Sequence, residues 1–378
     1  MFTLTRDQLA LVNAVRDFAT NELAPHAAEW DETHHFPIDV LREAGQLGLG
    51  GIYADERFGG SGLSRSDAVR VFEELAQGDV TIAAYISIHN MVVWMIDRFG
   101  NDRQRAEWVT ALTTMGALGS YCLTEPGMGS DAAALRTRAE RVGDQYVLNG
   151  VKQFTSGAGA AAVYVVMART AETGSHGISA IVVPAGTPGM SFGPLEKKMG
   201  WHAQPTRQVV FDEVHVPVAN RLGAEGDGFG IAMHALDGGR LNIGACSLGG
   251  GQLALDKTVA YLKTREAFGS PLIEKEALLF QLADMRMQLE SARTLLWRAA
   301  DALDRGADDA VVLCAMAKRM ATDAGFEVAN AALQLHGGYG YLSEYGIERI
   351  VRDLRVHQIL EGTNEIMRLI VGRDLAGA

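Results

Sequence analysis

Residues 121–131 read Tyr121-Cys122-Leu123-Thr124-Glu125-Pro126-Gly127-Met128-Gly129-Ser130-Asp131, and the pattern of the chain changes at this stretch. A short apolar run leads into a turn rich in glycine, which lets a backbone approach a ligand closely. The hydroxyls of Thr124 and Ser130 are able to bond ring heteroatoms or amide-like groups. By its spacing alone, the stretch is equally compatible with a strand end followed by an ordinary turn.

Helical periodicity precedes this stretch, up to about residue 117. Apolar residues such as Leu11, Val15 and Phe18 recur three or four positions apart. A glycine-rich break at 59–62 separates this pattern from further helical segments. We therefore predict an N-terminal helical bundle over residues 1–117.

Short β-rich runs separated by glycine and proline follow the stretch. The pair Gly143-Asp144 fits the tip of a hairpin. Long helical patterns return later and include 249–262, 277–303 and 310–335. We predict a middle β domain over 118–228 and a C-terminal helical bundle over 229–378, which makes the fold class α+β and mostly α.

Composition narrows the possible partners. The net charge of −12 argues against a nucleic-acid partner, because phosphate binding needs a basic face. Cys122, Cys246 and Cys314 are odd in number and far apart, so we expect neither disulfides nor a metal site. The ten histidines show no metal-binding spacing. We also expect no membrane span, because no stretch approaches roughly 20 uninterrupted apolar residues.

The first residues lead straight into a helical pattern, without an apolar signal or an Arg/Ser-rich transit segment. We therefore expect a cytoplasmic bacterial protein or, for a mature processed chain, a protein of the mitochondrial matrix.

Glu361 is the candidate catalytic residue, in the run Ile359-Leu360-Glu361-Gly362-Thr363-Asn364-Glu365-Ile366. Two apolar residues precede it and a glycine follows, so it lies where a helix-forming segment breaks. Burial at such a point raises the pKa of a carboxyl group toward the range of a general base. The alternative is a solvated glutamate beside a helix that Thr363 or Asn364 caps.

Two other segments carry ligand-binding residue types. Phe154-Thr155-Ser156 offers an aromatic plane beside two hydroxyls, which suits a flat heterocycle, although a core phenylalanine is the simpler alternative. The segment 334–342 places an amide, glycines and aromatics at a helix end, where a glycine C-cap is the plainer explanation. A Rossmann site is disfavoured, because no GxGxxG follows a strand and opens a helix.

Together these segments resemble the acyl-CoA dehydrogenase family, and the resemblance covers essentially the whole chain. It is carried by YCLTEPGMGSDAA at 121–133, TREAFGSPL at 264–272, QLHGGYGYL at 334–342 and VRDLRVHQILEGTNEIMRLI at 351–370. Within the family, the chain is most like the isobutyryl-CoA dehydrogenase branch. The segments that carry this closer likeness are SIHNMVVWMIDRFGN at 87–101, KKMGWHAQPTR at 197–207, PVANRLG at 217–223 and LDGGRLNIGACSLGG at 236–250.

The resemblance implies a helical bundle, a β-barrel and a four-helix bundle in that order. It implies tightly bound FAD, a homotetramer and electron delivery to an electron-transfer flavoprotein. The implied reaction removes the α-proton of an acyl-CoA thioester while a hydride leaves the β-carbon for the flavin. With isobutyryl-CoA the product is methacrylyl-CoA, a step of valine catabolism.

Site residues carry over by motif position. Glu361 matches the base, and its backbone N–H matches one of two donors that polarise the thioester oxygen. The implied cofactor contacts are Tyr121, Cys122, Leu123, Thr124, Glu125, Pro126, Gly127, Met128, Gly129, Ser130, Phe154, Thr155, Ser156, Thr363, Asn364 and Glu365 and, toward the FAD of a neighbouring subunit, Arg265, Lys275, Glu276, Gln334, Leu335, His336, Gly337 and Gly338. The implied substrate contacts are Ser130, Asp237, Gly238, Gly239, Arg240 and Arg373.

Two positions distinguish this chain within the family. The isovaleryl and long-chain branches carry their base at the position of Gly239, which here bears no side chain, so the resemblance assigns the base to Glu361. Family members usually have Gln at the position of Glu276, where a carboxylate would face an anionic cofactor. Either that contact is lost or Lys275 compensates for it.

The leading hypothesis is therefore a short branched-chain acyl-CoA dehydrogenase that acts on isobutyryl-CoA. A straight short-chain or 2-methylbutyryl-CoA dehydrogenase is the near alternative. An acyl-CoA oxidase and a catalytically silent acyl-CoA-binding protein are the more remote ones.

Overall fold

Capped helices build the first part of the chain. In this computed structural model, which describes residues 4–172 and 174–377, Thr5 and Ser64 each form a capping box with a side chain three residues later. Asp79 caps the next helix by accepting from the backbone N–H of Ile82 at 2.7 Å. The helices are α1 (Arg6–Phe18), α2 (Ala27–Thr33), α3 (Ile38–Gln46), α4 (Arg65–Gly78), α5 (Val80–Phe99), α6 (Asp102–Gln104) and α7 (Thr110–Thr113).

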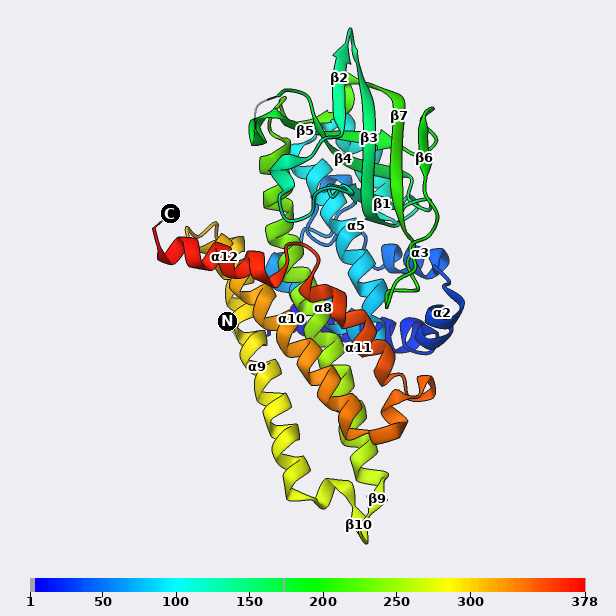
Figure 1. Ribbon diagram of the computed structural model, residues 1–378, viewed down its shortest axis with the longest axis vertical. Helices are drawn as coiled ribbons and strands as arrows, with labels where there is room; N and C mark the ends of the chain where they lie inside the picture. The colour runs from blue at the N-terminus through cyan, green and yellow to red at the C-terminus, as the bar shows by residue number, and fades with distance from the viewer. Residues whose placement is uncertain (1–3, 173, 378) are drawn as a thin grey trace.

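A sheet of eight strands follows, above the helices in Figure 1. The strands are β1 (Gly119–Cys122), β2 (Arg138–Val142), β3 (Gln145–Ser156), β4 (Val163–Arg169), β5 (Ile178–Pro184), β6 (Met190–Phe192), β7 (Thr206–Pro217) and β8 (Arg221–Leu222). Their order is β6-β7-β3-β2-β4-β5-β8, and β1 pairs in parallel with β4. The predicted hairpin tip at Gly143-Asp144 is confirmed, because Val142 pairs with Gln145 and Gly143 has a φ of 64°.

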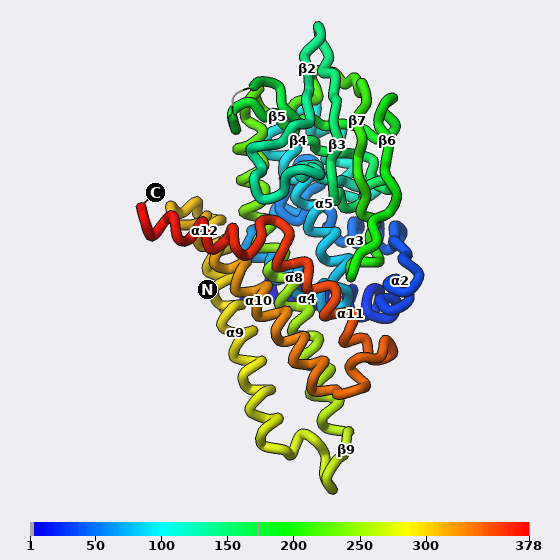
Figure 2. The backbone as a smooth tube through the Cα atoms, viewed as in Figure 1, coloured from blue at the N-terminus to red at the C-terminus, as the bar shows by residue number. Residues whose placement is uncertain are grey.

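Long helices return in the last part of the chain and run side by side along the molecule (Figure 2). The elements are α8 (Gly228–Thr264), β9 (Glu266–Ala267), β10 (Ser270–Pro271), α9 (Glu276–Asp304), α10 (Ala310–Leu335), α11 (Ile347–Arg355) and α12 (Asn364–Leu375). The predicted α+β class, with helices in the first and last parts and strands between them, is confirmed.

Helix α8 begins about twenty residues before the segment 249–262 that periodicity marked most clearly. Glycines hide its first half from a pattern-based analysis, since glycine is a poor helix former. The structure explains their presence by close packing. A Cβ on Gly249 would lie 2.2 Å from the carbonyl oxygen of Glu73 in α4, and one on Gly251 would lie 3.0 Å from the Cα of Gly325 in α10.

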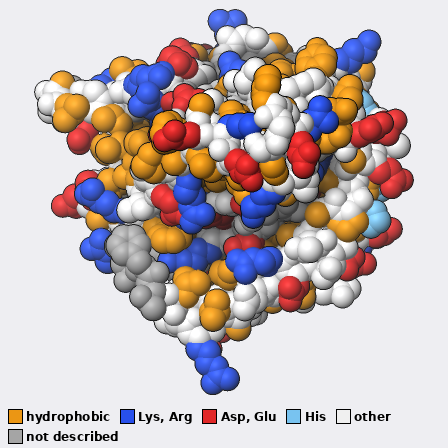
Figure 3. Space-filling model, turned by 90° about the horizontal axis from the view of Figure 1, so that it is seen from below, with side chains coloured by type: hydrophobic (Ala, Val, Ile, Leu, Met, Phe, Trp, Pro, Cys, Tyr) orange, Lys and Arg blue, Asp and Glu red, His pale blue; other side chains and the backbone are white. Residues whose placement is uncertain are grey.

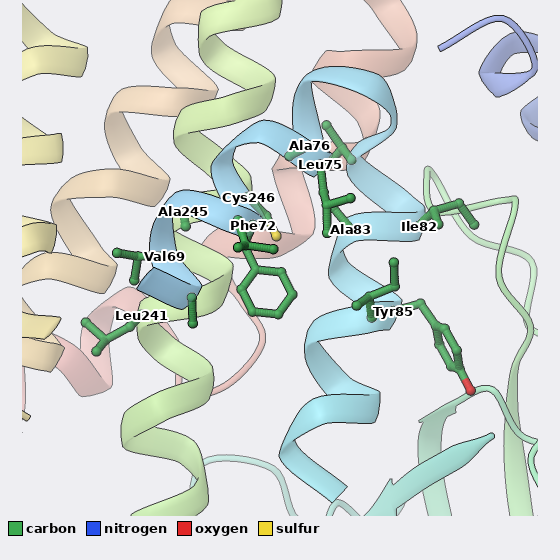
Figure 4. Close-up of a cluster of buried hydrophobic side chains, with 14 of the residues drawn as sticks. Val69, Phe72, Leu75, Ala76, Ile82, Ala83, Tyr85, Leu241, Ala245 and Cys246 are labelled. Carbon is green, nitrogen blue, oxygen red and sulfur yellow. The ribbon is translucent and has the colours of Figure 1, made fainter. Parts of the chain in front are cut away.

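The core joins the first and last domains into one unit. Phe72 and Leu75 from α4, Tyr85 from α5, and Leu241 and Cys246 from α8 are all buried and belong to one cluster (Figure 4). Figure 4 shows α4 and α5 beside α8. These two helices of the first domain therefore support the helix that carries Gly239 and Arg240.

Helix α5 is a long apolar helix that polar residues interrupt. It is long and apolar enough to cross a membrane by length and composition, with a mean hydropathy of 1.3, and 83% of that window is buried inside the protein. The polar residues that interrupt it, His89 and Asn90, are buried and bonded to the backbone oxygens of Leu112 and Leu49. This burial is that of a core helix.

We expect Gly325→Ala to lower the free energy of unfolding by about 1–3 kcal/mol, because the new methyl group would lie 2.3 Å from the carbonyl oxygen of Ser247. Gly372→Ala in α12 is the matched control. Nothing lies within 4 Å of its Cβ position, so we expect it to raise stability by about 0.5–1 kcal/mol. Urea unfolding of both variants checks the pair, and equal effects would contradict close α8–α10 packing.

Candidate active site

The glycine-rich turn after β1 lies against β3. The backbone N–H of Gln153 donates to the carbonyl oxygen of Thr124 at 2.8 Å, and the Cys122 sulfur lies 3.7 Å from the Thr155 hydroxyl oxygen. Two segments that are thirty residues apart in sequence thus form one surface. The structure therefore brings together the predicted cofactor residues 121–130 and Phe154-Thr155-Ser156.

Glu125 anchors this turn from the inside. Its carboxylate accepts from Lys152 Nζ at 2.8 Å and from the backbone N–H groups of Arg136 and Thr137. Burial favours the neutral acid, but Lys152 and these donors prevail and hold the pKa of Glu125 below its ordinary value. The Glu125 carboxylate is therefore bonded within the protein, so a cofactor could contact this position only through the backbone.

The outer side of the turn fits a flat heterocycle. Gly127 and Gly129 face open space, because a Cβ at either position would meet nothing within 4 Å. Phe154 lies next to the turn with 63% of its surface exposed, at a φ of 55° and within a register shift of β3. An exposed aromatic plane beside backbone without side chains suits the ring of FAD.

Glu361 lies in a tight connection between α11 and α12. Its φ is 54°, an uncommon conformation for a residue with a side chain. Thr363 caps α12 by accepting from the backbone N–H of Ile366 at 3.3 Å, so the predicted cap is confirmed. The Glu361 Oε2 atom is buried and has no hydrogen-bond partner among the described residues. An unpartnered buried carboxylate oxygen is costly, which is typical of a functional group.

Burial raises the pKa of Glu361 to about 7, while the positive charges of Lys318 and Arg240 oppose the rise. The carboxylate in turn raises the pKa of the Tyr121 and Tyr53 hydroxyls, both of which burial already raises. Tyr121 also packs with Leu360 in a small apolar cluster. The strand that opens the cofactor turn therefore reaches the candidate base.

Gly239 faces this carboxylate directly. A Cβ at position 239 would lie 2.5 Å from Glu361 Oε2 and 3.3 Å from the Met91 sulfur. The position that holds the base in other branches of the family thus lies against the base expected here. A side chain at 239 would therefore require the Glu361 carboxylate to move.

Other predicted substrate residues surround Gly239 in α8. Asp237 and Arg240 form a buried ion pair at 2.6 Å, and Arg240 Nε also donates to the Glu361 carbonyl oxygen at 3.3 Å. Gly238 lies against the Arg65 guanidinium, 2.3 Å from its Cβ position. These residues therefore support the loop of Glu361, and their contacts with a substrate remain predictions.

The remaining predicted cofactor residues lie elsewhere. A pocket of about 910 Å³ lies at the end of the last domain and is lined by Arg265, Lys275 and residues 334–338, among others. This end carries β9 and β10 and lies opposite the sheet in Figure 1. Glu276 begins α9 beside the pocket but is not among its lining residues. One chain thus presents two separate sets of predicted FAD contacts.

The residues after the base have different environments. Asn364 is buried and bonded to Thr322 and Asp323, whereas Glu365 is exposed. Arg373 is exposed three turns further along α12, so the helix separates it from Glu361.

Sequence reasoning missed several residues around the base. Met91 and Tyr53 are near the carboxylate, and Lys318 is fully buried below its loop. Lys318 gave one signal that pattern analysis could have used, since it falls among the small and apolar residues of the buried face of α10, whereas Arg319 does not. Within the described residues, no group of His, Cys, Asp and Glu could hold a metal ion, and all three cysteines are buried and free.

Comparisons with known proteins agree with this geometry. Sequence models of the acyl-CoA dehydrogenase N-terminal, middle and C-terminal domains match residues 5–116, 120–214 and 226–376. The mitochondrial isobutyryl-CoA dehydrogenase of Bos taurus is 53% identical over 372 residues, 98% of this chain and 89% of that protein. Its counterpart in Dictyostelium discoideum is 50% identical over 374 residues, 99% of this chain and 90% of that protein.

Solved structures give the same result. Butyryl-CoA dehydrogenase from Megasphaera elsdenii superimposes with a TM-score of 0.96 at 39% identity over 100% of both chains. A structure described as the electron transferring flavoprotein of Acidaminococcus fermentans gives 0.97 at 38% identity over 99% of both. A glutaryl-CoA dehydrogenase from Mycobacterium smegmatis, in complex with FADH2, gives 0.94 at 29% identity over 99% of this chain and 96% of that one. The chain therefore belongs to the acyl-CoA dehydrogenase family, whose members are FAD-dependent oxidoreductases.

Proposed function

We propose that Glu361 is the base that removes the α-proton of a short branched acyl-CoA, most specifically isobutyryl-CoA. The observation that carries this proposal is the buried, unpartnered Oε2 atom of Glu361, opposite a position without a side chain. A carboxyl group with a pKa of about 7 is half ionised at neutral pH and is a stronger base than a free glutamate.

The residues of the chain divide the chemistry between them. FAD, when bound, would supply the acceptor for the hydride of the β-carbon. Glu361 takes the proton from the α-carbon. The backbone N–H of the same residue donates a hydrogen bond to the thioester oxygen, where negative charge develops. Gly127, Gly129 and Phe154 would hold the flavin side of the site. This division makes the carboxylate and the backbone of one residue act on neighbouring atoms of the substrate.

A small cluster of buried apolar side chains beside the proposed base favours an apolar acyl group. Ala84, Ile88, Ile243 and Trp201 are buried together, and Leu360 packs against them immediately before the base. The isobutyryl-CoA dehydrogenases of Bos taurus and Dictyostelium discoideum share half or more of their aligned residues with this chain. We therefore assign isobutyryl-CoA, with methacrylyl-CoA as the product in valine breakdown.

The two separate sets of cofactor residues support an oligomer. One FAD on the 121–130 turn is remote from the pocket lined by Arg265 and residues 334–338, so we propose that this pocket serves a neighbouring subunit of a homotetramer. Figure 3, the view from this end, shows hydrophobic side chains gathered between charged ones, and Phe268 and Tyr341 are 97% and 80% exposed. Exposed aromatics of this size are typical of protein contacts.

We further propose that an electron-transfer flavoprotein reoxidises the flavin, as in the family. The relatives include mitochondrial and bacterial proteins, so the cytoplasm of a bacterium and the mitochondrial matrix are the two compartments we propose.

Glu361→Gln keeps the shape of the side chain and removes the base. We expect it to retain FAD and to bind acyl-CoA, while kcat falls by at least about 10²-fold. Bleaching of the flavin absorbance on mixing with isobutyryl-CoA is the measurement. Normal bleaching would remove Glu361 from the role of base, and a wild-type protein that cannot be loaded with FAD would defeat every flavoenzyme hypothesis.

The pH dependence of kcat/KM follows from the raised pKa of Glu361. Only the ionised carboxylate can accept the proton, so we expect kcat/KM to be low well below pH 7, to rise as pH passes about 7 and to level off above it. A steady-state series from pH 5.5 to 9 with one substrate checks this. A profile that is already flat at about pH 5 would mean that the working carboxyl keeps its ordinary pKa.

Substrate preference is tested by comparing kcat/KM for isobutyryl-, butyryl- and 2-methylbutyryl-CoA. We expect isobutyryl-CoA to lead 2-methylbutyryl-CoA by roughly 10-fold or more, because the latter adds one methylene, which is worth about 1–3 kcal/mol in an apolar pocket. We also expect it to lead butyryl-CoA, its straight-chain isomer, which differs in shape and not in carbon count. A clear preference for butyryl-CoA would favour the straight short-chain alternative. Rapid peroxide formation without an added electron acceptor would indicate an oxidase.

A further inference from the structure

Lys318 lies in α10 directly below the loop that carries Glu361. Its side chain is fully buried, and Nζ donates to the Gly362 carbonyl oxygen and to the Asn364 side-chain oxygen, both at 2.9 Å. The next turn of α10 adds Thr322, which exchanges hydrogen bonds with Asn364 at 3.0–3.3 Å. The helix therefore holds the residues on both sides of Thr363, the cap of α12.

The loop needs such support because its backbone is strained. Glu361 has a φ of 54° and Gly362 a φ of 93°, so two consecutive residues are in the left-handed half of conformational space. A non-glycine residue there is strained and persists only where its surroundings enforce it. Arg240 holds the Glu361 carbonyl oxygen from α8, and Lys318 holds the next carbonyl oxygen from α10.

We propose that Lys318 is a positioning residue for the reaction. By binding the Gly362 carbonyl oxygen, Lys318 fixes the carboxylate and the backbone N–H of Glu361. Its positive charge also favours the ionised carboxylate. This inference rests on the proposed role of Glu361 as the base. It assigns a role in the reaction to a buried helix residue whose side-chain hydrogen bonds are to Gly362 and Asn364.

The charge of Lys318 persists at neutral pH. Burial lowers its pKa to about 8, and Glu361 opposes the fall. The same charge lowers the pKa of Glu361, against the burial that raises it. The charged or titratable groups that interact with this pair from the surrounding elements are Arg240 and Cys246 in α8, Asp323 in α10, Glu365 in α12, Tyr121 in β1, Tyr53, and His357 before the loop.

Two substitutions separate the hydrogen bond from the charge. Lys318→Met removes both, whereas Lys318→Gln keeps a donor for the carbonyl oxygen and removes the charge. For Lys318→Met we expect kcat to fall on the order of 10- to 100-fold with a smaller change in KM, because a displaced base impairs chemistry more than binding. For both variants we expect the kcat/KM profile to move upward by about one pH unit, since an opposite charge nearby no longer favours the ionised form of Glu361.

Lys257→Met is the control. Lys257 also donates to a backbone carbonyl oxygen, that of Tyr345 at 3.2 Å, but its side chain is exposed, whereas that of Lys318 is fully buried. It lies on α8 about 26 Å along the helix from Arg240, at 1.5 Å per residue. We expect this variant to keep the wild-type kcat and the wild-type midpoint of the pH profile.

The assays use the FAD-loaded enzyme, with FAD content and unfolding midpoint measured for every variant. A wild-type pH midpoint in Lys318→Gln, or in Lys318→Met, would overturn the inference, even if stability falls. If Lys318→Met does not fold, Lys318→Gln decides the question alone. A base elsewhere would instead show as activity in Glu361→Gln, so failure of the proposed function is distinguishable from failure of this inference.

Discussion

The site depends on keeping one carboxylate both buried and ionisable. Burial alone would leave Glu361 protonated at neutral pH, and full solvation would leave it a weak base. Arg240 and Lys318 bind the carbonyl oxygens of Glu361 and Gly362, so the cations that hold the backbone also moderate the pKa of the side chain. Because these cations come from α8 and α10, the pKa of Glu361 depends on how the two helices pack.

That packing explains the unusual sequence of α8. Gly239 and Arg240 of this helix lie beside Glu361, the proposed catalytic base. Further along, Gly249 packs against α4 and Gly251 against α10. Its glycines weaken the helix locally, but they let α4 and α10 approach within contact distance of the backbone. Tertiary contacts thus override intrinsic propensity over much of its length.

The sequence predicted the parts of the fold that local chemistry determines. The hairpin at Gly143-Asp144 and the cap at Thr363 were predictable because short-range geometry demands these residue types. The start of α8 was not, because its glycines are explained only by partners far away in sequence. Lys318 was equally hidden, since its ligands are a backbone oxygen and an amide that lie more than forty residues away. Glu125 was predicted among cofactor residues, yet its side chain is committed to Lys152, a pairing that no local pattern indicates.

The contact between Gly239 and Glu361 also makes the two positions dependent on each other. A side chain at 239 would place its Cβ 2.5 Å from Oε2, so the carboxylate would have to move. A substitution in α8 therefore acts on the charge distribution of the loop before α12, although the two positions are far apart in sequence.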